Sequence, residues 1–299
     1  MNRNLLVTGS HRSGTTWVGR MLALSTQFTY VHEPFNVNYP HALSSVNFDR
    51  WYTYVTETSN PAHRESIQQA FSLRYPISQE VRNVEGLGQL KAVARNFLRY
   101  AIDRWAGRAV LMKDPLALLS AEWIAQECGV DVLVMIRHPA AFAGSLKVKG
   151  WTFPFEDLLD QPQLIEDHFE DHVDDIEAFA ENEYDVVDQA ALLWTLLYSV
   201  VRKYQNRHPE WIYLRHEDVA QNPLSTFESL YDTFGLDFTD SIRQEVEAHS
   251  RSSGGEDALH RDSSAVIQNW TERLTASEIE RVRRRTEPVA SHFYSEDDW

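Results

Sequence analysis

The sequence predicts an α/β fold with a central parallel sheet of about five strands flanked by helices. Short apolar runs recur along the chain, stretches with helical periodicity separate most of them, and 299 residues suffice for a large α/β domain. This alternation is typical of a parallel sheet whose two faces are covered by helices. The expected strands are Leu5–Val7, Phe28–Val31, Val110–Met112, Val132–Ile136 and Trp211–Leu214.

The first strand leads into a glycine-framed loop, Gly9–Thr16, and a helical pattern begins at Trp17. Such a unit turns backbone N–H groups and the positive end of a helix toward one point, which favours a bound phosphate. The two glycines have the Walker A spacing, but Thr15 stands where a P-loop NTPase has lysine, and Arg12 supplies a positive charge instead. The unit is therefore P-loop-like, and we do not expect it to be built for ATP.

Polar and charged residues follow each of the other expected strands. Because the carboxyl ends of parallel strands meet at one edge of a sheet, these residues are expected to gather into a site that suits an anionic ligand. The segments are His32–Pro34, Lys113–Pro115, Arg137–Pro139 and Arg215–Asp218.

The segment after the fourth strand suits a second phosphate. Pro139 is well placed in the first turn of a helix, so Arg137 is expected at the strand-to-helix junction. Ser145 follows eight residues later, on the helix. The paired N–H donors of an arginine guanidinium, together with a hydroxyl near the N-terminus of a helix, can bind a phosphate. Taken alone, Arg137 could equally form a structural ion pair with a carboxylate.

The net charge of −16 comes mostly from one segment, residues 156–188, which has fourteen Asp or Glu and no Lys or Arg. Elsewhere 30 acids stand against 28 bases, so we expect no nucleic-acid partner. Apolar residues recur in this segment at helical spacing, which predicts a helix with a solvated acidic face. That face could also repel polyanionic acceptors or attract a basic one. His168 and His172 lie four residues apart, but their order is not the zinc-protease motif and we expect no metal site.

The chain is expected to be a cytoplasmic protein. A single cysteine, Cys128, excludes a disulfide framework within the chain, and no leader precedes the strand that starts at Leu5. The longest apolar stretch, Ala190–Val201, is too short to be a transmembrane segment.

The pattern predicts one domain over residues 1–299, with insertions on the acceptor side around 36–109 and 151–188 and a mobile polar loop at Ser250–Asp262. Aromatic residues in the two insertions would suit stacking against sugar rings or an apolar aglycone, or would form core. They are Trp51, Tyr52, Tyr54, Trp151, Phe153 and Phe155.

The motif Gly-x-x-Arg-Ser-Gly-Thr-Thr-Trp after the first strand, with Arg137-His-Pro and Ser145 after the fourth, resembles the sulfotransferases that use 3′-phosphoadenosine 5′-phosphosulfate (PAPS). His32–Phe35 and Lys113–Pro115 resemble the bacterial and carbohydrate-type members. The resemblance implies donor binding by Arg12, Ser13, Gly14, Thr15, Thr16, Trp17, Arg137 and Ser145.

In that reading Ser13–Thr16 hold the 5′-phosphate, Arg12 the bridging oxygen, and Arg137 with Ser145 the 3′-phosphate, and 3′-phosphoadenosine 5′-phosphate (PAP) is the product. Trp17 would contact the adenine, or would pack in the core. Weaker matches are Tyr213–Asp218, Ser263, Ser264 and Trp270, and Arg251 or Arg261 could add charge.

The chemistry implied is an in-line sulfuryl transfer in which positioning and electrostatics dominate and no metal is required. The family's Lys-x-His histidine is absent, so we expect Glu33 to be the general base, with Asp114, His11 and His32 as alternatives. Lys113 would stabilise the sulfuryl oxygens, or would form an ion pair with Asp114 or Glu33.

The expected acceptor is a hydroxyl or amine of a glycan, a glycolipid or a small metabolite, and the sequence does not predict the oligomeric state. Two alternative functions remain open: a P-loop small-molecule kinase, and a catalytically inactive nucleotide-binding protein.

Overall fold

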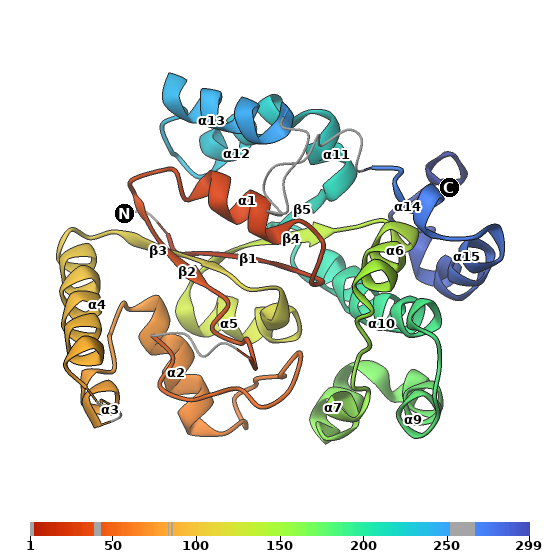
Figure 1. The fold of residues 1–299 in the computed structure, drawn as a ribbon, viewed down its shortest axis with the longest axis horizontal. Coiled ribbons are helices and arrows are strands. Elements are labelled where there is room, and N and C mark those ends of the chain that lie inside the picture. The colour runs from red at the N-terminus through yellow and green to blue at the C-terminus, as the bar shows by residue number, and fades with distance from the viewer. Residues whose placement is uncertain (1–2, 39–42, 83, 85, 252–266) are drawn as a thin grey trace.

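Five parallel strands form one sheet in the order β2-β3-β1-β4-β5 (Figure 1). The protein is seen in a computed structural model, which describes residues 3–38, 43–82, 84, 86–251 and 267–299. The predicted fold class is confirmed, and all five predicted strands are present with slightly different bounds. The strands are β1 (Leu5–Gly9), β2 (Phe28–His32), β3 (Ala109–Lys113), β4 (Asp131–Ile136) and β5 (Ile212–Arg215).

Side chains of the central strand β1 enter two different hydrophobic cores. Leu6 packs on one face of the sheet, Leu5 and Val7 pack on the other, and all three are fully buried. Successive residues of a strand point to opposite faces, so both faces of this strand are covered. This is why the strand forms an unbroken apolar run in the sequence.

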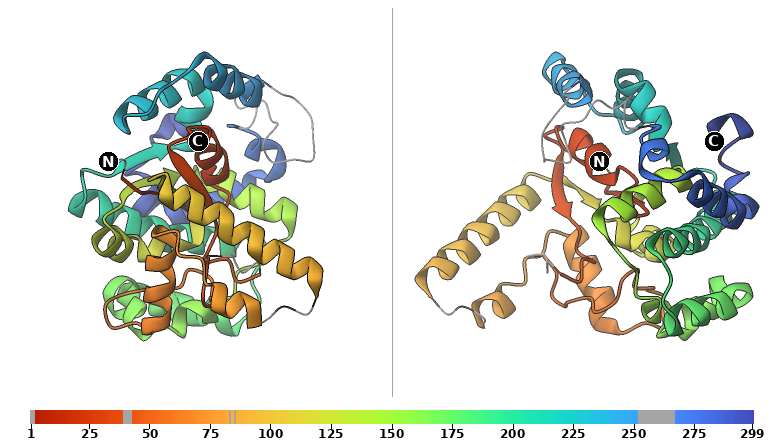
Figure 2. Two further views of the ribbon diagram at one scale, coloured as in Figure 1. Left: turned by 90° about the vertical axis from the view of Figure 1, so that its left-hand side faces the viewer. Right: turned by 45° about the vertical axis from the view of Figure 1, so that its right-hand side comes forward.

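Helices cover both faces of the sheet (Figures 1 and 2). One face carries α1 (Thr15–Leu22), α11 (His216–Gln221), α12 (Pro223–Thr233) and α13 (Asp240–Arg251). The other face carries α2 (Pro61–Phe71), α5 (Ala121–Cys128), α6 (Pro139–Lys149), α10 (Val186–Arg207) and α15 (Ala276–Ala290). Further helices are α3 (Ile77–Arg82), α4 (Leu87–Trp105), α7 (Glu156–Leu159), α8 (Pro162–Leu164), α9 (Val173–Glu181) and α14 (Trp270–Arg273), with 3-10 turns at Pro115–Ser120, Glu170–His172 and Glu296–Asp298.

The long helix α10 holds two of the loops that follow strands. It packs against α6 and α15, and its Tyr198 is fully buried. The Tyr198 hydroxyl shares a 2.9 Å hydrogen bond with Ser10 Oγ and accepts the backbone N–H of Arg137 at 3.1 Å. One side chain therefore contacts both the loop after β1 and the loop after β4.

The acidic segment 156–188 is largely helical, as its apolar spacing predicts, but it is not one continuous helix. A π-helical turn at Ile165–Phe169 and the 3-10 turn after it interrupt the path between α8 and α9. His168 is buried in the π turn, with its ring edge-on to Tyr54, whereas His172 belongs to the 3-10 turn. Within the described ranges, no cluster of three or more His, Cys, Asp or Glu could hold a metal ion. The apolar stripe is buried at Phe169, Ile176 and Phe179.

No helix in the described part of the chain is long and apolar enough to cross a membrane. Most of the loop Ser250–Asp262 lies outside the described residues, and so do Arg261, Ser263 and Ser264.

Candidate active site

The glycine-framed loop after β1 adopts a backbone conformation that its two glycines make possible. Gly9 has φ of +145°, and a Cβ there would lie 2.4 Å from the carbonyl oxygen of Met135. Gly14 has φ of +96°, and a Cβ there would lie 2.5 Å from Nδ1 of His216. Arg12 takes a left-handed conformation with φ of +65°, which is uncommon for a residue with a side chain. The loop therefore packs closely against strand β4 and against the segment after β5.

The start of α1 is open to an anion. The first backbone bond of the helix runs from the N–H of Val18 to the carbonyl of Gly14 at 3.1 Å. The N–H groups of Thr15, Thr16 and Trp17 thus belong to the first turn, which has no intrahelical acceptors for them. No described side chain caps this end, and the first turn contains no acidic residue. The described residues therefore leave the positive end of the helix dipole uncompensated.

The second predicted motif meets the first one. Arg12 donates its Nε–H to Ser145 Oγ at 3.1 Å, and Arg137 donates from Nη1 to the backbone carbonyl of Arg12. Arg137 is only 6% exposed. Burial lowers the pKa of Arg137 to about 10, against the opposing effect of the nearby Glu217. The guanidinium still keeps its proton near neutral pH, so two cations and a hydroxyl lie together at this edge of the sheet.

Arg137 is held rigidly by buried hydrogen bonds. Its backbone N–H bonds Tyr198, and its carbonyl oxygen accepts the indole N–H of Trp194 at 2.8 Å. The next residue, His138, donates its backbone N–H to Glu217 at 3.0 Å, and Glu217 also accepts the hydroxyl proton of Tyr294 at 2.9 Å. Sequence reasoning placed Glu217 after the fifth strand but missed that it supports Arg137, because its partner His138 lies 79 positions away in the chain.

Glu33 and Lys113 form an ion pair at the ends of β2 and β3. The Lys113 side chain is completely buried, whereas Glu33 is 20% exposed and so can reach a bound molecule. Glu33 also accepts a hydrogen bond from Asn36 Nδ2 at 2.7 Å. Burial works to raise the pKa of Glu33, but Lys113 and Asn36 outweigh it and hold this pKa below its ordinary value. Burial lowers the pKa of Lys113 despite its carboxylate partner.

Asp114 holds the backbone around Glu33. It is fully buried, and its two oxygens accept the backbone N–H groups of Phe35 at 2.6 Å and Leu116 at 2.9 Å. Burial raises the pKa of Asp114 to about 7. This geometry favours a positioning role for Asp114 over contact with an acceptor.

His11 lies in an aromatic environment beside the loop. Its backbone N–H and its Nδ1 both bond the hydroxyl of Tyr52, at 3.1 and 2.7 Å, and the ring lies edge-on to Trp51 and Phe142. Burial, helped by Arg12, lowers the pKa of His11 to about 3, so the ring is neutral near pH 7.

The predicted aromatic residues divide between the core and the surface of the site. Trp151 is 43% exposed, and the guanidinium of Arg12 lies 5.8 Å from its ring centre. Trp51 is half-buried, whereas Tyr52, Phe153 and Phe155 are buried in the core.

Trp17, the predicted adenine contact, is half-buried on the other side of the loop. Its ring packs edge-on against His216 and Phe227, and its indole N–H meets no hydrogen-bond partner within the described ranges. Trp270 is buried and stacks on His138, with ring centres 5.2 Å apart. Among the other candidates, His32 is exposed. For Arg251 the structure describes only the backbone.

A sequence model described as "Sulfotransferase family" matches residues 4–240. The chain belongs to this family. Comparison with curated protein sequences gives no significant match.

One solved sulfotransferase structure supports the same fold. The sulfotransferase domain from the curacin biosynthetic pathway is 14% identical and has a TM-score of 0.52, with 96% of this chain and 98% of that chain covered. The sulfotransferase domain of the Synechococcus PCC 7002 olefin synthase is 16% identical, with 98% and 95% covered and a TM-score of 0.46. A mouse sulfotransferase complexed with PAP is 10% identical, with 99% and 86% covered and a TM-score of 0.46. The last two likenesses are too weak to add to the family match.

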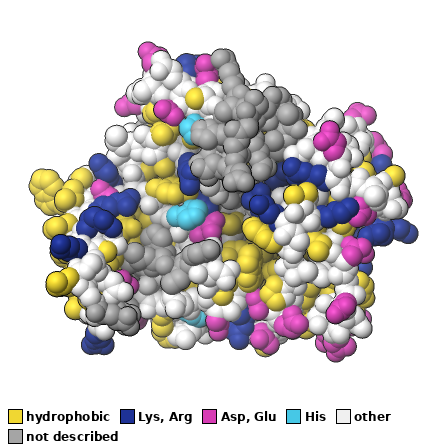
Figure 3. Space-filling view, viewed as in Figure 1, with side chains coloured by type: hydrophobic (Ala, Val, Ile, Leu, Met, Phe, Trp, Pro, Cys, Tyr) yellow, Lys and Arg dark blue, Asp and Glu magenta, His cyan; other side chains and the backbone are white. Residues whose placement is uncertain are grey.

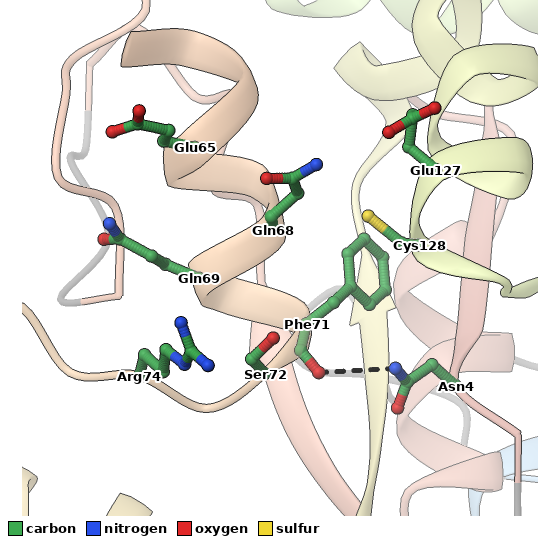
Figure 4. A pocket seen from close by; sticks show the side chains of 9 residues that line it. All are labelled: Asn4, Glu65, Gln68, Gln69, Phe71, Ser72, Arg74, Glu127 and Cys128. Carbon is green, nitrogen blue, oxygen red and sulfur yellow. Dashed lines mark hydrogen bonds between the residues drawn. The ribbon is translucent and has the colours of Figure 1, made fainter. Parts of the chain in front are cut away.

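A cavity of about 560 Å³ lies at the opposite edge of the sheet (Figure 4). Asn4, just before β1, and Cys128, at the end of α5, line it, and Asn4 Nδ2 donates to the carbonyl of Phe71 at 3.3 Å. None of the predicted site residues lines this cavity, so it is separate from the candidate active site.

Proposed function

We propose that this member of the sulfotransferase family moves a sulfuryl group from PAPS to a hydroxyl or amine of an acceptor. The observation that carries the proposal is the hydrogen bond from Arg12 to Ser145, because it joins the two predicted phosphate motifs at one edge of the sheet. A donor with a phosphate at both the 5′ and the 3′ position needs two such motifs side by side.

The residues present fit this donor. The uncapped first turn of α1 suits the 5′-phosphate, with Ser13–Thr16 supplying backbone N–H groups and hydroxyls. Arg137 and Ser145 suit the 3′-phosphate, and Nε of Arg137 is a buried donor without a hydrogen-bond partner among the described residues. Trp17 is proposed to contact the adenine, since its indole N–H is also a buried donor for which the described part of the chain offers no acceptor.

In the proposed mechanism, Arg12 stabilises the charge that develops on the bridging oxygen as the bond to sulfur breaks. Glu33 accepts the proton of the acceptor hydroxyl, whose oxygen attacks the sulfur in line with the leaving group. Lys113 stabilises the sulfuryl oxygens. When Lys113 turns from Glu33 toward those oxygens, Glu33 loses the ion pair that lowers its pKa and becomes a stronger base.

The reaction is proposed to require no metal. A sulfuryl group carries less negative charge than a terminal phosphoryl group, and Arg12 and Arg137 already place positive charge where the donor's anionic groups would bind.

We further propose that residues 1–299 act as one sulfotransferase domain, in which the segments 36–109 and 151–188 shape the acceptor site. Trp51 and Trp151 flank His11 near Arg12, which would suit stacking on a sugar ring or an apolar group of the acceptor. A glycan, glycolipid or small metabolite remains the proposed acceptor class, and a cytoplasmic location remains a prediction of the sequence.

Calorimetric titration with PAP and with ATP, each with and without Mg²⁺, tests the donor. We expect PAP to bind selectively and without metal, and to stabilise the protein by about 2.7 kcal/mol at one hundred times its Kd. Arg137→Ala should abolish this binding, whereas Arg202→Ala, at an exposed position of α10, should not. Preference for ATP with Mg²⁺ would indicate a kinase, and no binding of either nucleotide to the folded protein would indicate an inactive relative.

A further inference from the structure

Helix α4 carries an apolar face that no described part of the chain covers. The helix is attached to the body along a narrow strip in which Val93, Tyr100 and Asp103 are buried. Figure 3 shows hydrophobic side chains gathered at the edge of the molecule where Figure 1 places α4, with Lys and Arg side chains beside them. Large exposed apolar patches on a protein surface mark interaction sites. The exposed residues are Leu87 (79%), Leu90 (44%), Phe97 (39%), Leu98 (57%), Ile102 (61%) and Trp105 (91%).

The exposed apolar residues lie in one stripe along the helix, and Lys91 is the charged residue within it. With 3.6 residues per turn, they span an arc of roughly 140° around the helix axis. Arg95 and Arg99 lie along one side of the stripe, and Arg104 lies along the other. The one acidic residue of α4, Asp103, is buried and forms an ion pair with Arg108 at 3.0 Å. The borders of the stripe are therefore cationic, although the whole chain has a net charge of −16.

A groove of about 730 Å³ runs beside this helix. Its apolar lining includes Leu73, Tyr75 and Trp105, while Arg74 and Arg104 contribute guanidinium groups. An apolar groove with two cations at its wall matches the chemistry of an anionic amphiphile, which has an acyl chain and a charged head group.

Charge decides which occupant fits the α4 face. Symmetric pairing of α4 with the same helix of a second copy would bring Lys91, Arg95 and Arg99 of both copies together with no acid from either helix to offset them. An anionic lipid surface offers the opposite charge. Amphipathic helices with Lys and Arg at the borders and Leu, Phe and Trp on the apolar face lie in the plane of such surfaces.

We propose that α4 docks the protein onto membranes that contain anionic phospholipid. The apolar stripe enters the boundary between head groups and acyl chains, Trp105 lies at that interface, and Lys91 and the bordering Arg side chains contact lipid phosphates. The acidic segment 156–188, whose helices α7 and α9 lie at the other side of the view in Figure 1, is repelled by the same surface and so favours one orientation.

Vesicle flotation tests the proposal. The full chain should float with vesicles of phosphatidylcholine and phosphatidylglycerol, bind phosphatidylcholine vesicles far less, and lose binding as salt increases. Arg95→Gln and Arg99→Gln should each weaken binding by roughly fivefold, and Leu98→Gln with Trp105→Gln should abolish it. Arg202→Gln and Val148→Gln, at exposed positions outside α4, are matched controls that should bind as the unmodified protein does.

Circular dichroism of every variant should show unchanged thermal unfolding, since each replaced side chain is exposed. Absence of flotation with both kinds of vesicle would overturn the proposal. Sedimentation that reveals a dimer lost in Leu98→Gln with Trp105→Gln, without lipid binding, would overturn it in favour of contact between two copies.

Discussion

Glu217 accepts the backbone N–H of His138 at 3.0 Å, and this bond ties the segment after β5 to the residue that follows Arg137. The other carboxylate oxygen accepts the hydroxyl proton of Tyr294. Burial raises the pKa of Glu217 above its ordinary value, although Arg137 and the two hydrogen bonds oppose this. Glu217 is thus a positioning residue for the proposed 3′-phosphate contact.

Replacing Glu217 by Ala should leave the buried N–H of His138 without an acceptor, at a cost of about 1–3 kcal/mol in the free energy of unfolding. We expect the KM for PAPS to rise about tenfold, because Arg137 loses its support, while the KM for the acceptor stays unchanged. Glu217→Gln keeps an oxygen for His138 and should restore most of the donor affinity. An unchanged KM for PAPS in Glu217→Ala would contradict this role.

Glu33→Gln should lower kcat by about 10²- to 10⁴-fold, the usual contribution of a general base. The amide cannot take the proton of the acceptor. PAP affinity, measured by calorimetry, should remain near that of the unmodified protein, because the proposed phosphate contacts do not include Glu33. Turnover close to the original rate would instead assign the base to another residue, such as His11 or His32.

The pH profile reports the environment of Glu33. The pKa of Glu33 is held low, so kcat/KM should fall only when the pH drops below the ordinary pKa range of a glutamate. Asn36→Ala removes a hydrogen bond that lowers this pKa, so the acid limb of kcat/KM should move to higher pH. The same low pKa stabilises the fold above the unfolded pKa of about 4.3, and this contribution is lost as the pH falls through the folded value. An acid limb that does not move in Asn36→Ala would argue against Glu33 as the titrating group.

Gly14→Ala should damage both stability and donor binding. The residue has φ of +96°, and its new Cβ would lie 2.5 Å from Nδ1 of His216. We expect a loss of more than 1 kcal/mol in the free energy of unfolding, together with loss of PAP binding by calorimetry. Gly88→Ala is the matched control: a Cβ there meets nothing within 4 Å, and alanine in α4 should stabilise by about 0.5–1 kcal/mol. Equal effects at the two positions would show that the loop geometry is not the cause.

The centre of the sheet could be predicted because β1, β3 and β4 are buried on both faces. Leu5, Leu6 and Val7 form an unbroken apolar run for this reason, and the glycines and the proline at 139 mark the junctions that follow. The donor motifs are local in the sequence, so Arg12 and Ser145 could be named before their 3.1 Å contact was seen.

The supporting contacts could not be predicted, because they join distant segments through single side chains. Tyr198 bonds Ser10 across 188 positions, and Tyr52 bonds His11 across 41. Periodicity marks such residues as buried but carries no information about which polar atom each one meets. The interruption at Ile165–Phe169 was missed for a related reason, since apolar spacing tolerates one π-helical turn.

The shared hydroxyl of Tyr198 has a consequence for how this scaffold could diversify. Because one phenol touches both the loop after β1 and the backbone of Arg137, a tilt of α10 would carry the two proposed phosphate contacts together and preserve their separation. The separation between the two proposed phosphate contacts is then set by a single helix. Tyr52, in the segment 36–109, bonds His11 and so has to be kept. Substitutions elsewhere in the segments 36–109 and 151–188 leave the link through Tyr198 unchanged, so they can admit new acceptors while donor binding is retained.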